Sequence, residues 1–408
     1  MTASTEFFTS NCTGCYYFRW PILILCALTI VVVYTVPTLM VPVLFAEIAA
    51  DLDLNVVQLG VVWGSVSLSS MLIGLIGGAL SDRFGAKPSI ILVCVLIGIF
   101  GSLRGLTSSY GALVGSMLLY GFVAPALPPM LHKTGAFLFA ERKGISTITI
   151  STGFALSLFL GSRYTATWLS PTIGGWRNVL YLFGGLAVVF AVLWTFVPKR
   201  AFAEPTAQND AFFSAIFKAV RQVLQVREVW YIGIASLAYW AAIRGFVGYT
   251  PIYLRGLGWD AVTADNTISL FFLGSLIFAI PSTYLSERFG QRHLLLVVAT
   301  GLAGLGIGLL GTGEATLIVL GSILAGALFD SYMANHQAAL LDLEGISVFT
   351  GSALGLMVMF REIGGFFSPP LGSLLVEIDP GMPFYLWGAF GLIAAVVYLF
   401  MPRSVKTS

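Results

Sequence analysis

Long apolar stretches separated by short polar ones make up almost the whole chain. Windows of about 20 apolar residues, the length that crosses the hydrocarbon core of a bilayer, occur twelve times. They cover 19–46, 56–80, 88–107, 112–134, 146–169, 177–197, 229–254, 266–285, 292–311, 315–339, 348–375 and 382–402. Several exceed 20 residues, so we expect them to tilt or to project beyond the hydrocarbon. The pattern predicts an all-α membrane protein with twelve transmembrane helices.

Composition excludes a soluble protein and gives no sign of nucleic-acid binding. The 408 residues are 57% hydrophobic and 10% charged, against about 25% charged in a typical soluble domain. The net charge of +2 is close to balance and offers no basic stripe for nucleic acid. The first ten residues contain Glu6 and no lysine, which argues against a cleavable signal peptide. The first span is therefore expected to be permanent.

The basic residues predict the orientation in the membrane. Most of the 21 lysines and arginines fall in loops or tails on one side of the predicted spans, whereas Arg177 and Arg255 fall on the other. Basic loops mark the cytoplasmic side. With an even number of spans, both termini are then cytoplasmic, in a plasma membrane of the bacterial type.

Two distant pairs of segments show that the halves of the chain repeat. SDRFGAKPSIILV from Ser81 matches SERFGQRHLLLVV from Ser286 at an offset of 205 positions. The sixth and twelfth spans match at an offset of 204, with Tyr181 opposite Tyr385. Nearly equal offsets at separate anchors indicate a duplicated six-span unit, and duplicated halves with a site between them are typical of transporters.

The longest polar stretch, 198–228, separates the two halves. Its second part is amphipathic and basic, so we expect it to lie on the cytoplasmic face of the bilayer and bind lipid headgroups. The predicted organisation is a tail (1–18), a six-helix bundle (19–197), the linker (198–228), a second six-helix bundle (229–402) and a tail (403–408).

These motifs carry a family resemblance. GGALSDRFGAK (77–87), between the second and third spans, resembles the signature loop of the major facilitator superfamily, and TYLSERFGQR (283–292) resembles its second-half copy. The twelve spans, the long middle loop, GGWR (174–177) and the sequence of 351–372 agree. The resemblance covers nearly the whole chain. It implies two bundles around a central cavity lined by spans 1, 4, 7 and 10.

The signature loop is expected to gate the cytoplasmic side rather than to bind cargo. Asp82 can accept hydrogen bonds at the start of the third span, and Arg83 and Lys87 can pair with carboxylates or helix ends of the other half. Gly78 permits close helix approach and Gly85 a tight turn. The alternative is a tight hairpin with ordinary cytoplasmic charges. The second-half copy adds Glu287, Arg288, Gly290 and Arg292 to this gating set.

Two arginines at membrane depth are the main candidates for binding cargo. A charge at the bilayer centre costs about 2.5–3.5 kcal/mol on insertion scales, and Arg244 and Arg361 both fall deep in predicted spans. A guanidinium matches carboxylate or oxyanion geometry, so the pair suggests an anionic cargo. Internal pairing is the alternative: Arg361 with Asp330, or Arg244 with a carbonyl near Pro251. Glu362 points about 100° away from Arg361 on an ideal helix and is not expected to pair with it.

A second group of candidates lies toward the cytoplasm. His132 and His336 occupy equivalent places in the two halves, offset by 204 positions, and Lys133 and Asn335 adjoin them. We expect these four residues to flank the cavity and to bind substrate. Histidine changes charge near neutral pH, which suits proton coupling. The alternative is a histidine that bonds a helix end.

Two carboxyl groups are candidates for carrying protons. Glu362 and Asp330 both fall in predicted spans, and an apolar setting favours the protonated form of a carboxyl group. Two further arginines are given other roles. Arg104 is expected to snorkel outward from the third span as a structural residue. Arg163 is either an outer-gate residue or a partner of Tyr164.

No feature of the sequence predicts an enzyme, a metal site or a cofactor. Cys12 and Cys15 form a C-x-x-C in the tail, but two thiolates cannot close a zinc site. No nucleotide-binding loop and no nucleophile with a paired base is evident.

The sequence therefore predicts a monomeric secondary transporter that works by alternating access on a small organic or inorganic anion. Proton symport or exchange would drive it. One alternative is an exporter of hydrophobic drugs, for which the aromatic content of 13% would serve. Another is a receptor or sensor that binds ligand without transport, suggested by the C-x-x-C.

Overall fold

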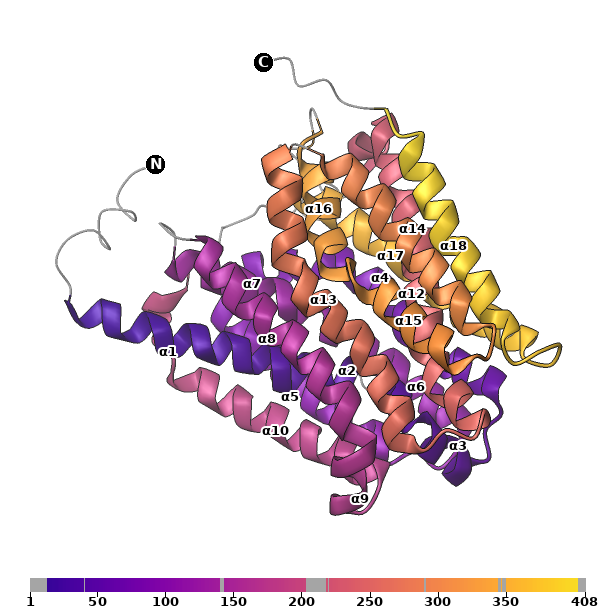
Figure 1. The fold of residues 1–408 in the computed structure, drawn as a ribbon. Helices are drawn as coiled ribbons and strands as arrows, with labels where there is room; N and C mark the ends of the chain where they lie inside the picture. The colour runs from indigo at the N-terminus through magenta and orange to yellow at the C-terminus, as the bar shows by residue number, and fades with distance from the viewer. Residues whose placement is uncertain are drawn as a thin grey trace.

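The computed structural model describes the backbone of residues 13–39, 41–139, 143–202, 218, 220–289, 291–343, 346 and 350–402. Within these ranges every regular element is a helix (Figure 1). The predicted all-α fold is confirmed. Residues 1–12 and 403–408 of the predicted tails, and most of the predicted surface helix of the linker, lie outside the described residues. Residues 13–18, predicted as part of the tail, form the start of the first helix.

The first half contains ten α-helices and two π-helical turns among the described residues. These are α1 (Thr13–Thr29), a π turn (Ile30–Thr35), α2 (Val36–Leu39), α3 (Phe45–Leu52), α4 (Val56–Phe84), α5 (Ala86–Gly105), α6 (Tyr110–Gly121), α7 (Leu127–Leu138), α8 (Lys143–Tyr164), a second π turn (Thr165–Leu169), α9 (Ser170–Ile173) and α10 (Trp176–Phe196).

The second half is simpler over the part that is described. It contains α12 (Arg227–Gly256), α13 (Ala261–Phe289), α14 (Arg292–Leu310), α15 (Ala315–Gly326), α16 (Phe329–Leu341), α17 (Thr350–Leu375) and α18 (Met382–Leu399).

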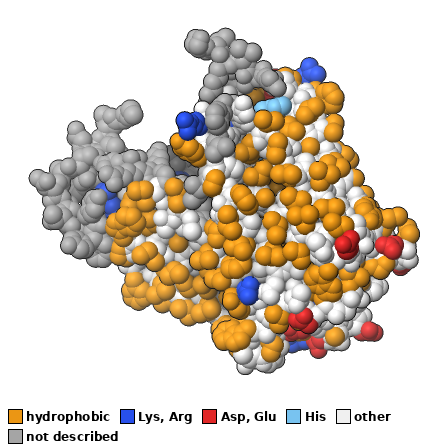
Figure 2. Space-filling view, in the orientation of Figure 1, with side chains coloured by type: hydrophobic (Ala, Val, Ile, Leu, Met, Phe, Trp, Pro, Cys, Tyr) orange, Lys and Arg blue, Asp and Glu red, His pale blue; other side chains and the backbone are white. Residues whose placement is uncertain are grey.

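Ten stretches of the described chain are helical, long and apolar enough to cross a membrane. Helices α12 and α17 have 30 and 26 residues but are not among the ten. They carry Arg244, and Arg361 with Glu362. They overlap the predicted spans 229–254 and 348–375. Figure 2 shows the lateral surface covered by apolar side chains, with few charged ones.

Local sequence sets where several helices begin and turn. Asn55 and Gln58 form a capping box at the start of α4, in which each side chain accepts a hydrogen bond from the other's backbone N–H. Gly85 joins α4 to α5 with φ +86, a conformation that favours glycine. The tight turn predicted at Gly85 is confirmed.

We call the end of the bundles at the α4–α5 and α13–α14 turns the inner end, since it is predicted to be cytoplasmic, and the other the outer end. At the outer end, α4 of the first half packs along α17 of the second (Figure 1). A Cβ at Gly60 would lie 2.9 Å from the carbonyl oxygen of Pro369, and one at Gly64 would lie 2.6 Å from that of Phe366. Small residues at such contacts let helix backbones approach in a membrane.

A second contact closes the outer end between α8 and α13. The hydroxyl of Ser162 donates to that of Ser269 across 3.2 Å. The apolar core also continues between the halves here, since Trp63 and Phe45 cluster with Phe246 and Trp387. We call this closed region, made of α4 with α17 and α8 with α13, the outer seam. Figure 1 shows the two groups of helices diverging toward the inner end.

Candidate functional site

Three charged side chains of the second half lie close together on the inner side of the outer seam. Arg244 of α12 lies within electrostatic range of Arg361 and Glu362 of α17. Tyr34, on the first π turn, lies within range of all three and brings the first half to the same place. Arg244, Arg361 and Glu362 therefore share one region of the second half.

Arg361 is paired with its neighbour in sequence. Its Nε and Nη2 donate to the same oxygen of Glu362, Oε1, at 3.0 and 2.7 Å. Glu362 is 5% exposed, and the guanidinium also lies 4.8 Å from the ring centroid of Trp240. The expectation that the two side chains point apart is wrong. The Cβ atoms diverge on a helix, but the arginine side chain is long enough to reach the carboxylate of the next residue.

Arg244, in contrast, contacts two neutral side chains. Its side chain is buried, with the residue 5% exposed. Its guanidinium carbon lies 3.9 Å from the ring centroid of Trp63, and its Nη2 donates to Ser67 Oγ at 3.0 Å. Its Nε is buried without a hydrogen-bond partner. The alternative in which a carbonyl near Pro251 receives Arg244 is not what the structure has.

The charge of Arg244 is not balanced by a contact. Among the described residues, no aspartate or glutamate lies within ion-pair distance of it. A buried charge without a counter-ion is costly, because desolvation is not offset by pairing. With Arg361 neutralised by Glu362, the cluster carries one net positive charge, and that charge belongs to Arg244.

Two more donors without partners lie one turn from Arg244. The hydroxyl of Tyr239 and the indole nitrogen of Trp240 are both buried and unbonded. The ring of Trp240 stacks on Phe329 at 6.0 Å between centroids, and that of Tyr239 lies 3.9 Å from Tyr332. Such orphan donors are uncommon in folded proteins. Each is free to donate to an acceptor-rich ligand that reaches it.

Ser67 and Tyr34 were not predicted from the sequence. Ser67 belongs to the run SVSLSS at 65–70, which is unusually rich in hydroxyls for a membrane span. That run was the available signal. Ser65, Ser69 and Ser70 of this run donate to backbone carbonyls, mostly of their own helix. Ser67 alone of the four is hydrogen-bonded to Arg244.

The predicted substrate residues of α16 are engaged within the second half. The Nδ1 of His336 is hydrogen-bonded to the Tyr398 hydroxyl at 2.9 Å. The amide of Asn335 donates to the Ser331 carbonyl, and its oxygen accepts from Ser286. The structure does not hydrogen-bond either residue to the arginines. On α7 of the first half, His132 is half-buried and Lys133 is exposed.

Asp330 is held by a serine rather than by an arginine. The Oδ2 of Asp330 accepts a hydrogen bond from Ser275 Oγ at 2.6 Å. The backbone nitrogen of Asp330 donates to that serine oxygen, Oγ, at 3.0 Å. These contacts lie where α15 gives way to α16. The alternative pairing of Arg361 with Asp330 is therefore wrong.

The described members of the gating set contact their own half. Lys87 donates to the carbonyls of Thr195 and Val197, at 2.7 and 2.6 Å, at the end of α10. In this state, with the bundles diverging at the inner end, the lysine bonds a helix end of its own half. Arg292 pairs with Asp342, also within one half. Arg288 is exposed. Outside the described residues lie Gly290 and the side chains at Gly78, Asp82, Arg83 and Glu287.

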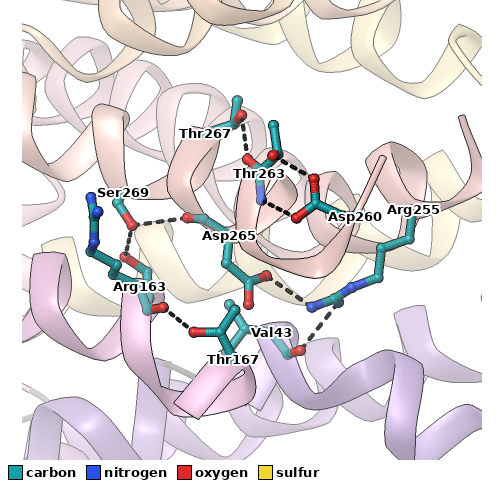
Figure 3. Close-up of polar contacts among 10 residues, drawn as sticks. Val43, Arg163, Thr167, Arg255, Asp260, Thr263, Asp265, Thr267 and Ser269 are labelled. Atoms are coloured by element: carbon teal, nitrogen blue, oxygen red, sulfur yellow. Dashed lines mark hydrogen bonds and ion pairs between the residues drawn. The ribbon is translucent and has the colours of Figure 1, made fainter. Parts of the chain in front are cut away.

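A polar cluster adjoins the outer seam (Figure 3). Arg255, at the end of α12, donates to Asp265 Oδ1 at 2.9 Å and to the Val43 carbonyl of the first half at 3.3 Å. Asp265 is fully buried, and its Oδ2 has no hydrogen-bond partner. In Figure 3 the side chain of Arg163 points away from Asp265. Its guanidinium lies 5.7 Å from the ring of Tyr164, the partner predicted as its alternative.

Arg104 does not snorkel. It is 1% exposed, its Nη1 donates to the Pro37 carbonyl at 2.9 Å, and its guanidinium lies 3.7 Å from the ring centroid of Tyr120. It joins the first span to α5 and α6 inside the first half. The structural role predicted for it fits these contacts, although its predicted exposure is wrong.

Comparison with known proteins adds two relatives. A probable nitrate/nitrite antiporter, NarK1, of Thermus thermophilus is 24% identical over 396 residues, which cover 90% of this chain and 87% of the relative. A probable galactarate/D-glucarate transporter, GudP, of Escherichia coli (strain K12) is 23% identical over 426 residues, covering 88% of each.

The fold is shared with a solved transporter. The crystal structure of nucleoside transporter NupG superimposes with a TM-score of 0.73 at 14% identity, covering 94% of this chain and 98% of that one. The family model described as Major Facilitator Superfamily matches residues 23–266 and 254–408. The chain belongs to the major facilitator superfamily, a family of multi-pass membrane transporters.

Proposed function

We propose that the protein carries a small organic or inorganic anion by alternating access, and that Arg244 is its main anion ligand. The observation that carries this proposal is the buried guanidinium of Arg244, which has a neutral serine and an indole for partners and an unbonded Nε. An anion would supply the missing charge. The unbonded donors of Tyr239 and Trp240 lie one turn away.

The names of two relatives support this class of cargo. One is named for nitrate and nitrite, and the other for galactarate and D-glucarate, all of which are anions at neutral pH.

Glu362 offers a route to proton coupling. While ionised it neutralises Arg361, with both bonds made to one oxygen. A proton on Glu362 would release the Arg361 guanidinium and leave two arginines facing one anion. The proton and the anion would then enter together, and their charges would cancel. Exchange of one anion for another needs no such step and is the second possible mode.

The test is a ligand screen on the purified full-length protein. Thermal unfolding is followed with nitrate, acetate and succinate, and with a neutral sugar, a nucleoside and a hydrophobic cation as the other classes. We expect stabilisation by at least one anion and by none of the others. Stabilisation only by the hydrophobic cation would contradict the proposal and favour the drug exporter.

Flux decides between a transporter and a sensor. Proteoliposomes loaded with the stabilising anion should exchange it for the labelled form. Binding without any flux would favour the receptor instead. We propose further that the protein acts as a monomer in a plasma membrane of the bacterial type, with both termini in the cytoplasm, because the basic loops fall on that side.

A further inference from the structure

The guanidinium of Arg244 reaches across the boundary between the halves. Both of its partners, Trp63 and Ser67, belong to α4 of the first half. Trp63 is also fixed from the other direction, because its Nε1 donates to the Arg244 carbonyl at 3.0 Å. The candidate anion ligand is thus held by the opposite bundle.

Two glycines of the second half make room for this contact. A Cβ at Gly248 would lie 2.6 Å from Cδ1 of Trp63, and a Cβ at Gly365 would lie 2.6 Å from Ser67 Oγ. Real Cβ atoms are not found so close to a neighbour, so a larger residue at either position would displace the side chain of Trp63 or Ser67. The fit is specific to the state in which the outer seam is closed.

Helix α4 is also the helix that closes the outer seam against α17, through Gly60 and Gly64. Access from the outside requires α4 to move away from α17 and α12, since alternating access moves one bundle against the other. That movement removes Trp63 and Ser67 from Arg244 together.

We infer that Ser67 and Trp63 are positioning residues that weaken anion binding to Arg244 while the outer seam is closed, so that the anion is released toward the inner end. This inference rests on the proposed function, in which Arg244 binds the anion. With the seam closed, Ser67 occupies one donor of the guanidinium and Trp63 covers one face of it. With the seam open, the donor and the face are both available to the anion.

Linkage gives the same result from the other direction. A ligand that binds one state more tightly shifts the equilibrium toward that state, and the coupling is reciprocal. An anion on Arg244 therefore favours separation of α4, and closure of α4 on Arg244 favours release. Ser67 and Trp63, which belong to the first half, would therefore set the anion affinity of Arg244 in the second half.

The test compares anion affinity in protein that is held with its outer seam closed. Ser162→Cys and Ser269→Cys, in a background without the four native cysteines, place two thiols where hydroxyls now lie 3.2 Å apart. The disulfide formed between these two introduced thiols, which we call the seam disulfide, holds the seam closed. Binding of whichever of nitrate, acetate or succinate stabilises the protein most is measured by calorimetry, with and without Ser67→Ala.

We expect Ser67→Ala to tighten binding by the cross-linked protein about tenfold, since it frees a charged donor from a competing acceptor. Ser65→Ala is the matched control, because Ser65 is equally buried and its hydroxyl donates only within α4, to the Val62 carbonyl. It should leave the affinity unchanged. Weaker or unchanged binding in Ser67→Ala would overturn the inference, and weaker binding would make Ser67 a direct ligand.

A second variant gives an answer should Ser67→Ala not fold. Trp63→Phe retains a ring but loses the hydrogen bond to the Arg244 carbonyl. Without anion, the seam disulfide should form about threefold more slowly than in the parent; an unchanged rate overturns the role of Trp63 in closure. If the parent protein binds none of the anions, the proposed function itself has failed, whereas binding that Ser67→Ala does not alter contradicts this inference alone.

Discussion

Arg244 and Arg361 lie on neighbouring helices of the same bundle, yet only one of them has its charge balanced by a contact. Arg361 uses the carboxylate of Glu362, the next residue along its own helix. Arg244 uses the ring and hydroxyl of Trp63 and Ser67, which are neutral and belong to the other bundle. One charge is balanced inside the fold, and the other is left for a ligand.

The two arginines also differ in how their contacts respond to movement of the bundles. The Arg361–Glu362 pair lies wholly on α17 and travels with it, so a rigid movement of the bundles leaves the pair intact. The contacts of Arg244 cross the outer seam and must change whenever the seam opens. A protonation event can act on the first arginine, and a conformational change can act on the second.

The largest effect is expected for Arg244→Gln. Loss of two charge-assisted hydrogen bonds, each worth about 1.5–3 kcal/mol, corresponds to about 100-fold or more in anion affinity. Unfolding temperature should be unchanged or higher, because the variant removes an unbalanced buried charge. Uptake by proteoliposomes and a thermal melt check both parts. Normal uptake would show that the contrast drawn between the two arginines is wrong and that the cargo is neutral or cationic.

Much of this fold could be predicted because bilayer thickness dictates helix length. The sixth predicted span, 177–197, is nearly coincident with α10 (Trp176–Phe196), and the third, 88–107, with α5 (Ala86–Gly105). The fifth, 146–169, ends in a π turn at Thr165–Leu169 that hydropathy cannot reveal. Apolar length reports that a helix crosses, not how its backbone is wound.

The candidate site was harder to predict because it depends on side-chain reach and on contacts between halves. Helical geometry correctly places the Cβ atoms of Arg361 and Glu362 apart, but it ignores the length of the arginine, which closes the gap. Ser67 gave a weak signal because hydroxyls in apolar helices usually bond their own backbone. The contact of Lys87 with the end of α10 could not be predicted, because a charge pattern does not say which helix end is near.

Glu362→Gln should give the second largest effect. The neutral amide resembles a protonated carboxyl group, so Arg361 stays available but no proton is taken up or released. Uptake driven by an inward proton gradient should fall to the level reached by exchange, while exchange of labelled anion continues. Both are measured in the same proteoliposomes, with and without the gradient. Gradient-driven accumulation at the parent level would remove Glu362 from coupling.

Arg361→Gln tests the paired arginine directly. It leaves Glu362, which is 5% exposed, without its partner and should lower the free energy of unfolding by about 1–3 kcal/mol. The double variant with Glu362→Gln removes both charges and should recover most of that loss, as a double-mutant cycle would report. Arg244→Gln should behave differently, because Arg244 has no paired carboxylate that the substitution would leave without a partner. Equal destabilisation by both single variants would erase the distinction between the two arginines.

A third arginine combines the two arrangements and should show the smallest effect. Arg255 is paired with a carboxylate, Asp265, and also donates across the outer seam to the Val43 carbonyl (Figure 3). Asp265→Asn keeps an acceptor for Arg255 but removes the charge that holds it against Val43. Closure of the seam should weaken modestly, and the seam disulfide should form about two- to threefold more slowly.

The control for that variant is Asp260→Asn, which makes the same change five residues earlier. Asp260 accepts hydrogen bonds from the backbone and hydroxyl of Thr263, and these lower its pKa, so it carries a charge at neutral pH. These contacts stay within the start of α13, so the cross-linking rate should not change. Equal slowing by both variants would assign the effect to loss of negative charge at the outer end. Slowing by Asp265→Asn alone would assign it to the arginine that the carboxylate holds across the seam.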